Sequence, residues 1–238
     1  MDVFEIISER RSVRKFLDAP VEWEKVSMIL EAGRLAPSAG NVQDWKFIVV
    51  TEPELRKKVA ESALKQYWIS KAPVIIIICS DIDKIKRQYG VRGERLYSIQ
   101  DCAIAATHMM LTAHSLGLAT CWVGAFEENI LQRALNIPDN SRPQVILPIG
   151  YPDETPKPTY RLRLENMVYL NGYGAVHRIK DMGGVLWDHN VLGRTIKVAK
   201  ETAKDIDKLT KKQRQSFSEK IKAKKEDFSK KLKERSKH

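Results

Sequence analysis

The sequence predicts a layered α/β or α+β domain, and three observations support this. Helical and strand patterns alternate from the N-terminus to about residue 152. The run VIIIIC (Val74–Cys79) is apolar throughout, so we expect a strand covered on both faces. Hydrophobic residues make up 43% of the 238 residues, enough for a core, and no apolar run is long enough to cross a bilayer.

In the first half of the chain, apolar residues recur at helical spacing in three segments, and Pro53 is typical of a first helical turn. The second helix should bury Trp23, Val26, Ile29 and Leu30. The helices are expected at residues 3–7, from Pro20 to about Gly33, and from Pro53 to about Leu64, with strands at 46–50 and 74–80.

In the second half of the chain, the sequence pattern predicts a long helix at residues 98–116. This helix is apolar nearly all round and ends at Gly117. Such a helix must be covered on every side, and a second subunit is a plausible cover. Strands are expected at 118–126 and 143–152, with a helix at 127–135 between them. The charged segment 84–95 is the expected lid over a site.

The net charge of +11 is concentrated at the C-terminus. Residues 194–238 hold 17 Lys/Arg and 7 Asp/Glu, whereas residues 1–193 hold 24 and 23. The C-terminal stretch has sparse apolar residues at helical intervals, which predicts a basic amphipathic helical tail at 194–238 after a connecting segment at 171–193. Its acids and bases are interleaved and it has few aromatics, so nucleic acid is an unlikely partner.

Cysteine, histidine and the N-terminus exclude several classes of protein. Cys79, Cys102 and Cys121 are widely spaced in apolar segments, which favours buried, reduced thiols. The five His residues have no zinc-ligand spacing, so no metal is expected. The N-terminus lacks the pattern of a secretory signal, and no membrane partner is expected. A cytoplasmic protein is predicted.

Three arginines, Arg10, Arg11 and Arg14, surround Ser12. Guanidinium groups this close repel one another unless an anion lies among them, and a phosphomonoester would suit. A solvated basic turn is the alternative. The nucleotide motifs G-x-x-x-x-G-K-[ST] and G-x-G-x-x-G are both absent from the sequence, so side chains would have to hold any phosphate.

Four stretches, in order, together resemble the FMN-dependent nitroreductase family. They are ERRSVRKF (9–16), APSAGNVQDWKFIVV (36–50), QDCAIAATHMMLTAHSLGLATCWVGAF (100–126), and PIGYPDE (148–154) leading to KPTYRLRLENMV (157–168). The resemblance implies a nitroreductase-like FMN-binding domain at 1–170. It implies an α+β fold with a central, mainly antiparallel sheet flanked by helices, an interlocked homodimer, and FMN at the subunit interface. The C-terminal helices would be an extension of this fold.

The resemblance also assigns roles to residues. Arg10, Ser12 and Arg14 would hold the FMN phosphate and ribityl chain, with Arg11 close by, Arg161 as a late phosphate ligand and Arg163 as a weaker one. The loop with Pro37, Ser38, Ala39 and Asn41 would reach the flavin held by the partner, while Gln43 and Trp45 anchor the loop and pack the core. Backbone amides near Val123 and Gly124 would face flavin N5 and O4. Tyr67 and Trp68 are weak candidates for substrate contact.

The resemblance implies an oxidoreductase in which hydride passes from NADH or NADPH through flavin N5 to a small conjugated electrophile, a nitroaromatic, quinone or similar, by a ping-pong mechanism. No catalytic side chain is required. Reductive dehalogenation and flavin-fragmenting chemistry stay open. The alternative is a non-catalytic flavin- or nucleotide-binding protein whose basic tail mediates interaction with a partner or polyanion.

Overall fold

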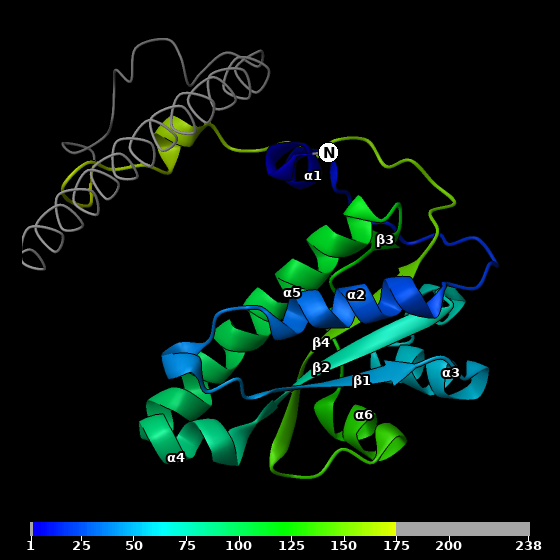
Figure 1. The fold of residues 1–238 in the computed structure, drawn as a ribbon, viewed down its shortest axis with the longest axis horizontal. Coiled ribbons are helices and arrows are strands. Elements are labelled where there is room, and N and C mark those ends of the chain that lie inside the picture. The colour runs from blue at the N-terminus through cyan, green and yellow to red at the C-terminus, as the bar shows by residue number, and fades with distance from the viewer. Residues whose placement is uncertain (1, 175–238) are drawn as a thin grey trace, which may run out of the picture. The chain divides into compact units, whose positions relative to one another are not determined.

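The computed structural model describes residues 2–174 (Figure 1). These residues fall into one compact unit that ends at Thr159 and the beginning of a second that starts at Tyr160. In the second unit, the rings of Tyr169 and Tyr173 lie 4.6 Å apart. The predicted tail at 194–238 and most of the connecting segment at 171–193 lie outside the described residues.

The helices and strands follow the order predicted from the sequence. The α-helices are α1 (Val3–Glu9), α2 (Trp23–Arg34), α3 (Pro53–Ser62), α4 (Ile82–Arg92), α5 (Ser98–Ser115) and α6 (Glu128–Leu135). The strands are β1 (Trp45–Val50), β2 (Val74–Asp81), β3 (Ala119–Thr120) and β4 (Ser141–Gly150). Short helical turns are η1 (Ala39–Asn41), η2 (Tyr67–Lys71), η3 (Gly93–Tyr97) and, in the second unit, η4 (Leu164–Asn166).

The four strands form one antiparallel sheet in the order β1-β2-β4-β3. In Figure 1, α2 and α5 cover one face of this sheet, and α3 and α6 lie on the other. Both faces are therefore buried, which explains why β2 is apolar at every position from Val74 to Cys79. The predicted α+β fold with a helix-flanked antiparallel sheet is confirmed.

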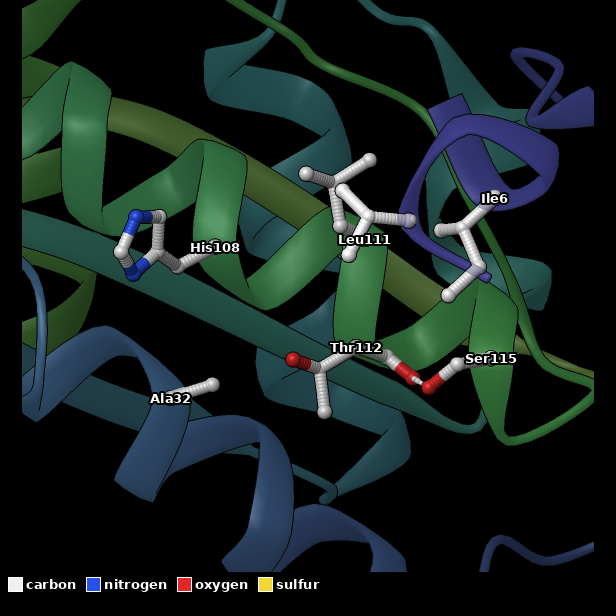
Figure 2. Close-up of a pocket in the computed structure, with 7 residues that line it drawn as sticks. Ile6, Ala32, His108, Leu111, Thr112 and Ser115 are labelled. Atoms are coloured by element: carbon white, nitrogen blue, oxygen red, sulfur yellow. Dashed lines mark hydrogen bonds between the residues drawn. The ribbon is translucent and has the colours of Figure 1, made fainter. Parts of the chain in front are cut away.

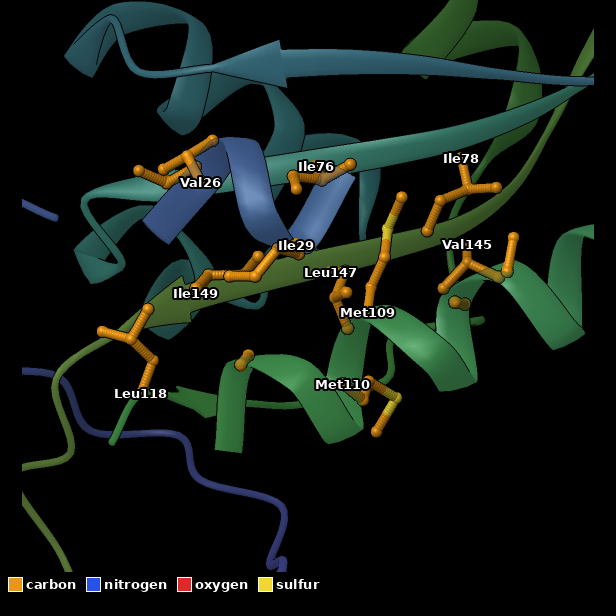
Figure 3. Close-up of a cluster of buried hydrophobic side chains, with 14 of the residues drawn as sticks. Val26, Ile29, Ile76, Ile78, Met109, Met110, Leu118, Val145, Leu147 and Ile149 are labelled. Carbon is orange, nitrogen blue, oxygen red and sulfur yellow. The ribbon is translucent and has the colours of Figure 1, made fainter. Parts of the chain in front are cut away.

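The side chains of β2 alternate between two cores, as the pleat of a strand requires. Ile76 and Ile78 point into the core under α2 and α5, which also holds Met109 and Leu147 (Figure 3). Ile75, Ile77 and Cys79 point into the other core, beneath α3 and α6. Cys79, Cys102 and Cys121 are all buried and free of disulfides, as predicted.

Three details differ from the sequence-based expectation. Trp23 was expected on the buried face of α2, but its side chain is 61% exposed because it begins the helix, before the buried positions Val26 and Ile29. The strand expected over 118–126 is reduced to β3 and a single bridge at Val123. The charged segment at 84–95, for which no helix was predicted, lies in α4 and one turn of π-helix, η3, which lead directly into α5. Its role as a lid stays a prediction.

Gly93 allows α4 and η3 to pack tightly. A Cβ atom at this position would lie 2.6 Å from the backbone oxygen of Ile85 and 2.9 Å from the Cβ of Tyr89. We expect Gly93→Ala to lower the free energy of unfolding by about 1–3 kcal/mol through overpacking. Thermal unfolding followed by circular dichroism measures this, and Val91→Ala, at a 58% exposed position nearby, is the matched control. Equal melting temperatures for the two variants would contradict the packing.

Candidate functional site

The segment that carries the clustered arginines runs extended beside β3. Ser12 forms a bridge with Thr120, and the N–H of Val13 donates to the oxygen of Thr120 at 3.1 Å. Val13 and Phe16 are buried and fix the segment to the core. The side chain of Arg14 is left exposed next to this anchored backbone.

Arg10, Ser12 and Arg14 converge near the end of β3. The guanidinium carbon of Arg14 lies 5.8 Å from the centroid of the Trp68 ring. Burial raises the pKa of the Cys121 thiol, and the nearby Arg14, Ser12 and Arg10 partly offset this rise. The structure thus brings these three residues to one place, and we call Arg10, Ser12, Arg14 and Trp68 the basic half-site.

Glu154 is a member of this region that the sequence reasoning missed. Its carboxylate accepts hydrogen bonds from the N–H groups of Arg14 at 2.6 Å and of Lys15 at 3.1 Å. It therefore fixes the backbone that carries the Arg14 side chain. The stretch PIGYPDE was recognised as a motif, but nothing in it indicated a contact with a segment 140 positions earlier.

Arg11 has a different environment from Arg14. Its guanidinium folds back to donate to the oxygen of Ser8 at 2.6 Å and to that of Arg10 at 2.9 Å. It therefore satisfies a carbonyl at the C-terminal end of α1. Next to it is a cavity of about 300 Å³, lined by Arg10, Arg11, His114, Thr120 and Glu154 among others.

The turn after β3 presents one backbone donor. The N–H of Val123 donates to the oxygen of Ile146 at 3.0 Å, and its side chain is buried. Gly124 is exposed, and no hydrogen bond occupies its N–H among the described residues. Of the two amides predicted to face a flavin, the Gly124 amide is therefore the one available here.

The second part of the predicted FMN site is the loop at residues 37–43, which we call the amide loop. It is stabilised by hydrogen bonds between its own residues. The hydroxyl oxygen of Ser38 accepts from the N–H of Gln43 at 3.0 Å, and the side-chain amide of Gln43 donates to that of Asn41 at 2.9 Å. Gly40, Asn41 and Gln43 all have left-handed backbone angles. Gln43 thus anchors the loop and Trp45 is buried in the core, as expected.

The amide loop and the basic half-site lie at opposite ends of α5. Asp101, in the first turn of α5, binds the N–H of Ala39 in the loop at 3.0 Å. Thr120, which pairs with Ser12, follows the other end of α5. An 18-residue helix is about 27 Å long. These two elements of one chain are too far apart to contact the same flavin ring.

The structure assigns no specific contact with a ligand to the remaining predicted site residues. Tyr67 is 53% exposed and Trp68 is half-buried, both in η2. Arg161 and Arg163 belong to the second unit, so their roles stay predictions. A further hollow has a volume of about 230 Å³ and a mostly apolar lining. Figure 2 shows Ile6 of α1, Ala32 of α2, and Leu111 and Thr112 of α5 around it.

Within residues 2–174, no helix is long and apolar enough to span a bilayer. The same residues contain no group of three or more metal-ligating side chains.

The fold and the sequence agree on one family. The nitroreductase family profile matches residues 7–72 and 63–151, and the chain belongs to this family. A relative from Methanothermobacter thermautotrophicus is 38% identical over 160 residues, covering 66% of this chain and 80% of that protein. FMN reductase [NAD(P)H] from Bacillus subtilis is 31% identical, covering 72% and 74%. The structure of NADPH:FMN oxidoreductase from Vibrio harveyi complexed with NAD+ aligns with a TM-score of 0.67 at 27% identity, covering 73% and 78%.

Proposed function

We propose that this protein is an FMN-dependent oxidoreductase that uses NADH or NADPH to reduce a small conjugated electrophile, such as a nitroaromatic or a quinone. The convergence of Arg10, Ser12 and Arg14 at the end of β3 carries this proposal. Guanidinium and hydroxyl donors suit a phosphomonoester, and the Gly124 N–H suits a polar ring edge. The names of the relatives from B. subtilis and V. harveyi support the same chemistry.

Each residue has a defined task in this proposal. Arg14 and Ser12 bind the phosphate, while Glu154 fixes the backbone beneath Arg14. The Gly124 N–H donates to the flavin ring, and Trp68 forms an aromatic wall beside Arg14. FMN held by these residues would supply the hydride chemistry, and we expect NAD(P)H and the acceptor to react at the site in turn, with ping-pong kinetics. No side chain of the protein has to act as acid or base.

We propose further that the working unit is a homodimer in which the amide loop of one chain completes the basic half-site of the other. The length of α5 supports this, since one chain holds the two elements at opposite ends. Exposed apolar side chains on α1 and α2 offer a surface for the partner. They are Val3, Phe4, Ile7, Trp23 and Met28.

Reconstitution with FMN tests the activity directly. We expect the purified protein to bind one FMN per chain and the flavin absorbance to bleach when NADH or NADPH is added without oxygen. Reoxidation by a nitroaromatic or a quinone, with initial rates giving parallel double-reciprocal lines, would support the ping-pong order. A protein that binds FMN but is bleached by neither nicotinamide would instead be the non-catalytic binder.

Coexpression of two defective chains tests the shared site. Arg14→Ala removes a donor of the basic half-site. Gly40→Val disrupts the amide loop, because Gly40 has a φ of +52°, which a β-branched residue does not adopt without strain. Each homodimer should bind FMN weakly. The mixed dimer should regain one tight site out of two, since one of its interfaces combines the two intact elements. Weak binding at both sites of the isolated mixed dimer would contradict a site built from two chains.

A further inference from the structure

Two aspartates lie buried at the base of the amide loop, and neither was predicted to have a role. Asp44 follows the loop and is fully buried, and Asp101 of α5 is 2% exposed. Within residues 2–174, no ion pair joins either carboxyl group to a basic side chain. Two buried carboxylates without a cation carry a large desolvation cost when both are ionised. The protonation state of the pair therefore has to be explained.

Each carboxyl group uses one oxygen for a hydrogen bond and leaves the other without a donor. The Ser80 hydroxyl donates to Oδ2 of Asp44, and the Ala39 N–H donates to Oδ1 of Asp101. Oδ1 of Asp44 and Oδ2 of Asp101 are buried and have no hydrogen-bond donor among the described residues. The Asp101 carboxyl is a hydrogen-bonding and charged neighbour of the Asp44 carboxyl. A single proton between them would satisfy both oxygens.

We propose that Asp44 and Asp101 share one proton and act as positioning residues for the amide loop. Asp101 holds the start of the loop through the Ala39 N–H, and the shared proton ties Asp44, at the end of the loop, to the same carboxyl group. The inference rests on the proposed function only in assigning FMN to this loop.

The groups around the pair favour a bound proton at mildly acidic pH. The pKa of the Asp44 carboxyl is raised to about 6. Burial is the main cause and Asp101 adds to the rise, whereas the hydrogen bond from Ser80 lowers the pKa. β2 adds Ser80 and the buried Cys79 thiol, and α5 adds the Cys102 thiol. Nearby, the Lys84 ammonium donates to the backbone carbonyl of Gln43, and the Asp81 N–H donates to the backbone carbonyl of Asp44, so neither hydrogen bond reaches the Asp44 carboxyl.

The sign of the pH dependence follows from this rise in pKa. An aspartate in an unfolded chain loses its proton near pH 4, whereas Asp44 keeps its proton to about pH 6 in the folded protein. The free energy of unfolding contributed by the pair is therefore greatest below about pH 4 and falls as the pH rises to about 6. Above this range the link between Asp44 and Asp101 is lost, and we expect the loop to hold FMN less tightly.

The test compares amide variants, which keep the link, with a variant that removes it. In Asp44→Asn and Asp101→Asn, a side-chain NH₂ donates to the remaining carboxylate at every pH. Asp44→Leu cannot form the bond, and Asp139→Asn, at an exposed aspartate, is the control. From about pH 5 to about pH 8, we expect wild type to lose about tenfold more FMN affinity than Asp44→Asn. The titration of the FMN phosphate is common to all variants and cancels in this comparison.

A second measurement does not depend on FMN. The melting temperature of the flavin-free protein should fall between about pH 4 and about pH 6 in wild type and Asp139→Asn, but should be nearly constant in both amide variants of the pair. Asp44→Leu should bind FMN weakly at all pH values. If Asp44→Asn follows the wild-type curves of melting temperature and affinity, the shared proton is disproved.

The two proposals fail in different ways. If no variant binds FMN at any pH, the proposed function is wrong. The pairing of Asp44 with Asp101 can still be decided without FMN, from the melting curves and from a ¹³C NMR titration of the two aspartate carboxyl groups. If FMN binds but the two carboxyls titrate independently at the values of exposed aspartates, the pairing is wrong and the proposed function stands.

Discussion

Replacing Arg14 with Ala should weaken FMN binding by about 10- to 100-fold, because a charge-assisted hydrogen bond contributes about 1.5–3 kcal/mol. Arg14 is exposed beside a backbone fixed by Glu154, and its guanidinium lies over Trp68, so the side chain is oriented before a ligand arrives. Titration of the flavin-free protein with FMN, followed by flavin fluorescence, measures the dissociation constant.

Lys15→Ala is the matched control for this prediction. It removes the same charge one residue later, and the backbone N–H of this position still donates to Glu154. We expect affinity close to that of wild type. Arg14→Lys should be intermediate, since an ammonium keeps the charge but loses the planar fork of donors. Arg14→Ala and Lys15→Ala with equal affinities would show that net charge, and not the position of Arg14, attracts the ligand.

Replacing Ile77 with Ala should lower the free energy of unfolding by about 2–5 kcal/mol. Ile77 is fully buried in the centre of β2 and packs in the core formed with α3 and α6. The sheet cannot collapse into the space left behind, because the opposite face of β2 is held by the core under α2 and α5. Chemical denaturation followed by circular dichroism measures the loss.

Ile77→Val is the control that distinguishes the cost of a cavity from the cost of any substitution in β2. It removes one methylene, keeps the β-branched shape that suits a strand, and should cost about 0.5–1.5 kcal/mol. If Ile77→Ala costs no more than Ile77→Val, Ile77 does not occupy the closely packed position described here.

The local patterns of the sequence were enough to predict most elements. The apolar run in β2, Pro53 at the start of α3 and the periodic spacing in α2 each depend on neighbours within a few residues. The pattern misled at Trp23, where helical spacing indicated burial but the side chain is 61% exposed at the first position of the helix. Periodicity indicates which residues share one face of a helix, but it does not indicate at which residue along the helix burial begins.

The candidate site was predicted less completely. The cluster around Ser12 was visible in the sequence, but the three arginines looked equivalent. In the structure, Arg11 binds carbonyls at the end of α1, whereas Arg14 lies over Trp68. The Val123 and Gly124 amides were likewise indistinguishable until the bridge to Ile146 occupied one of them.

The sequence by itself determined the order of the elements, the two-sided burial of β2 and the stretches shared with the nitroreductase family, since each depends on residues that are near one another in the chain. Only the tertiary structure decided that Glu154 holds the backbone of Arg14, that Asp44 meets Asp101, and that α5 separates the amide loop from the basic half-site. These pairings join residues 57 to 140 positions apart. Such contacts are set by how the helices pack on the sheet and by strand register, which no local pattern encodes.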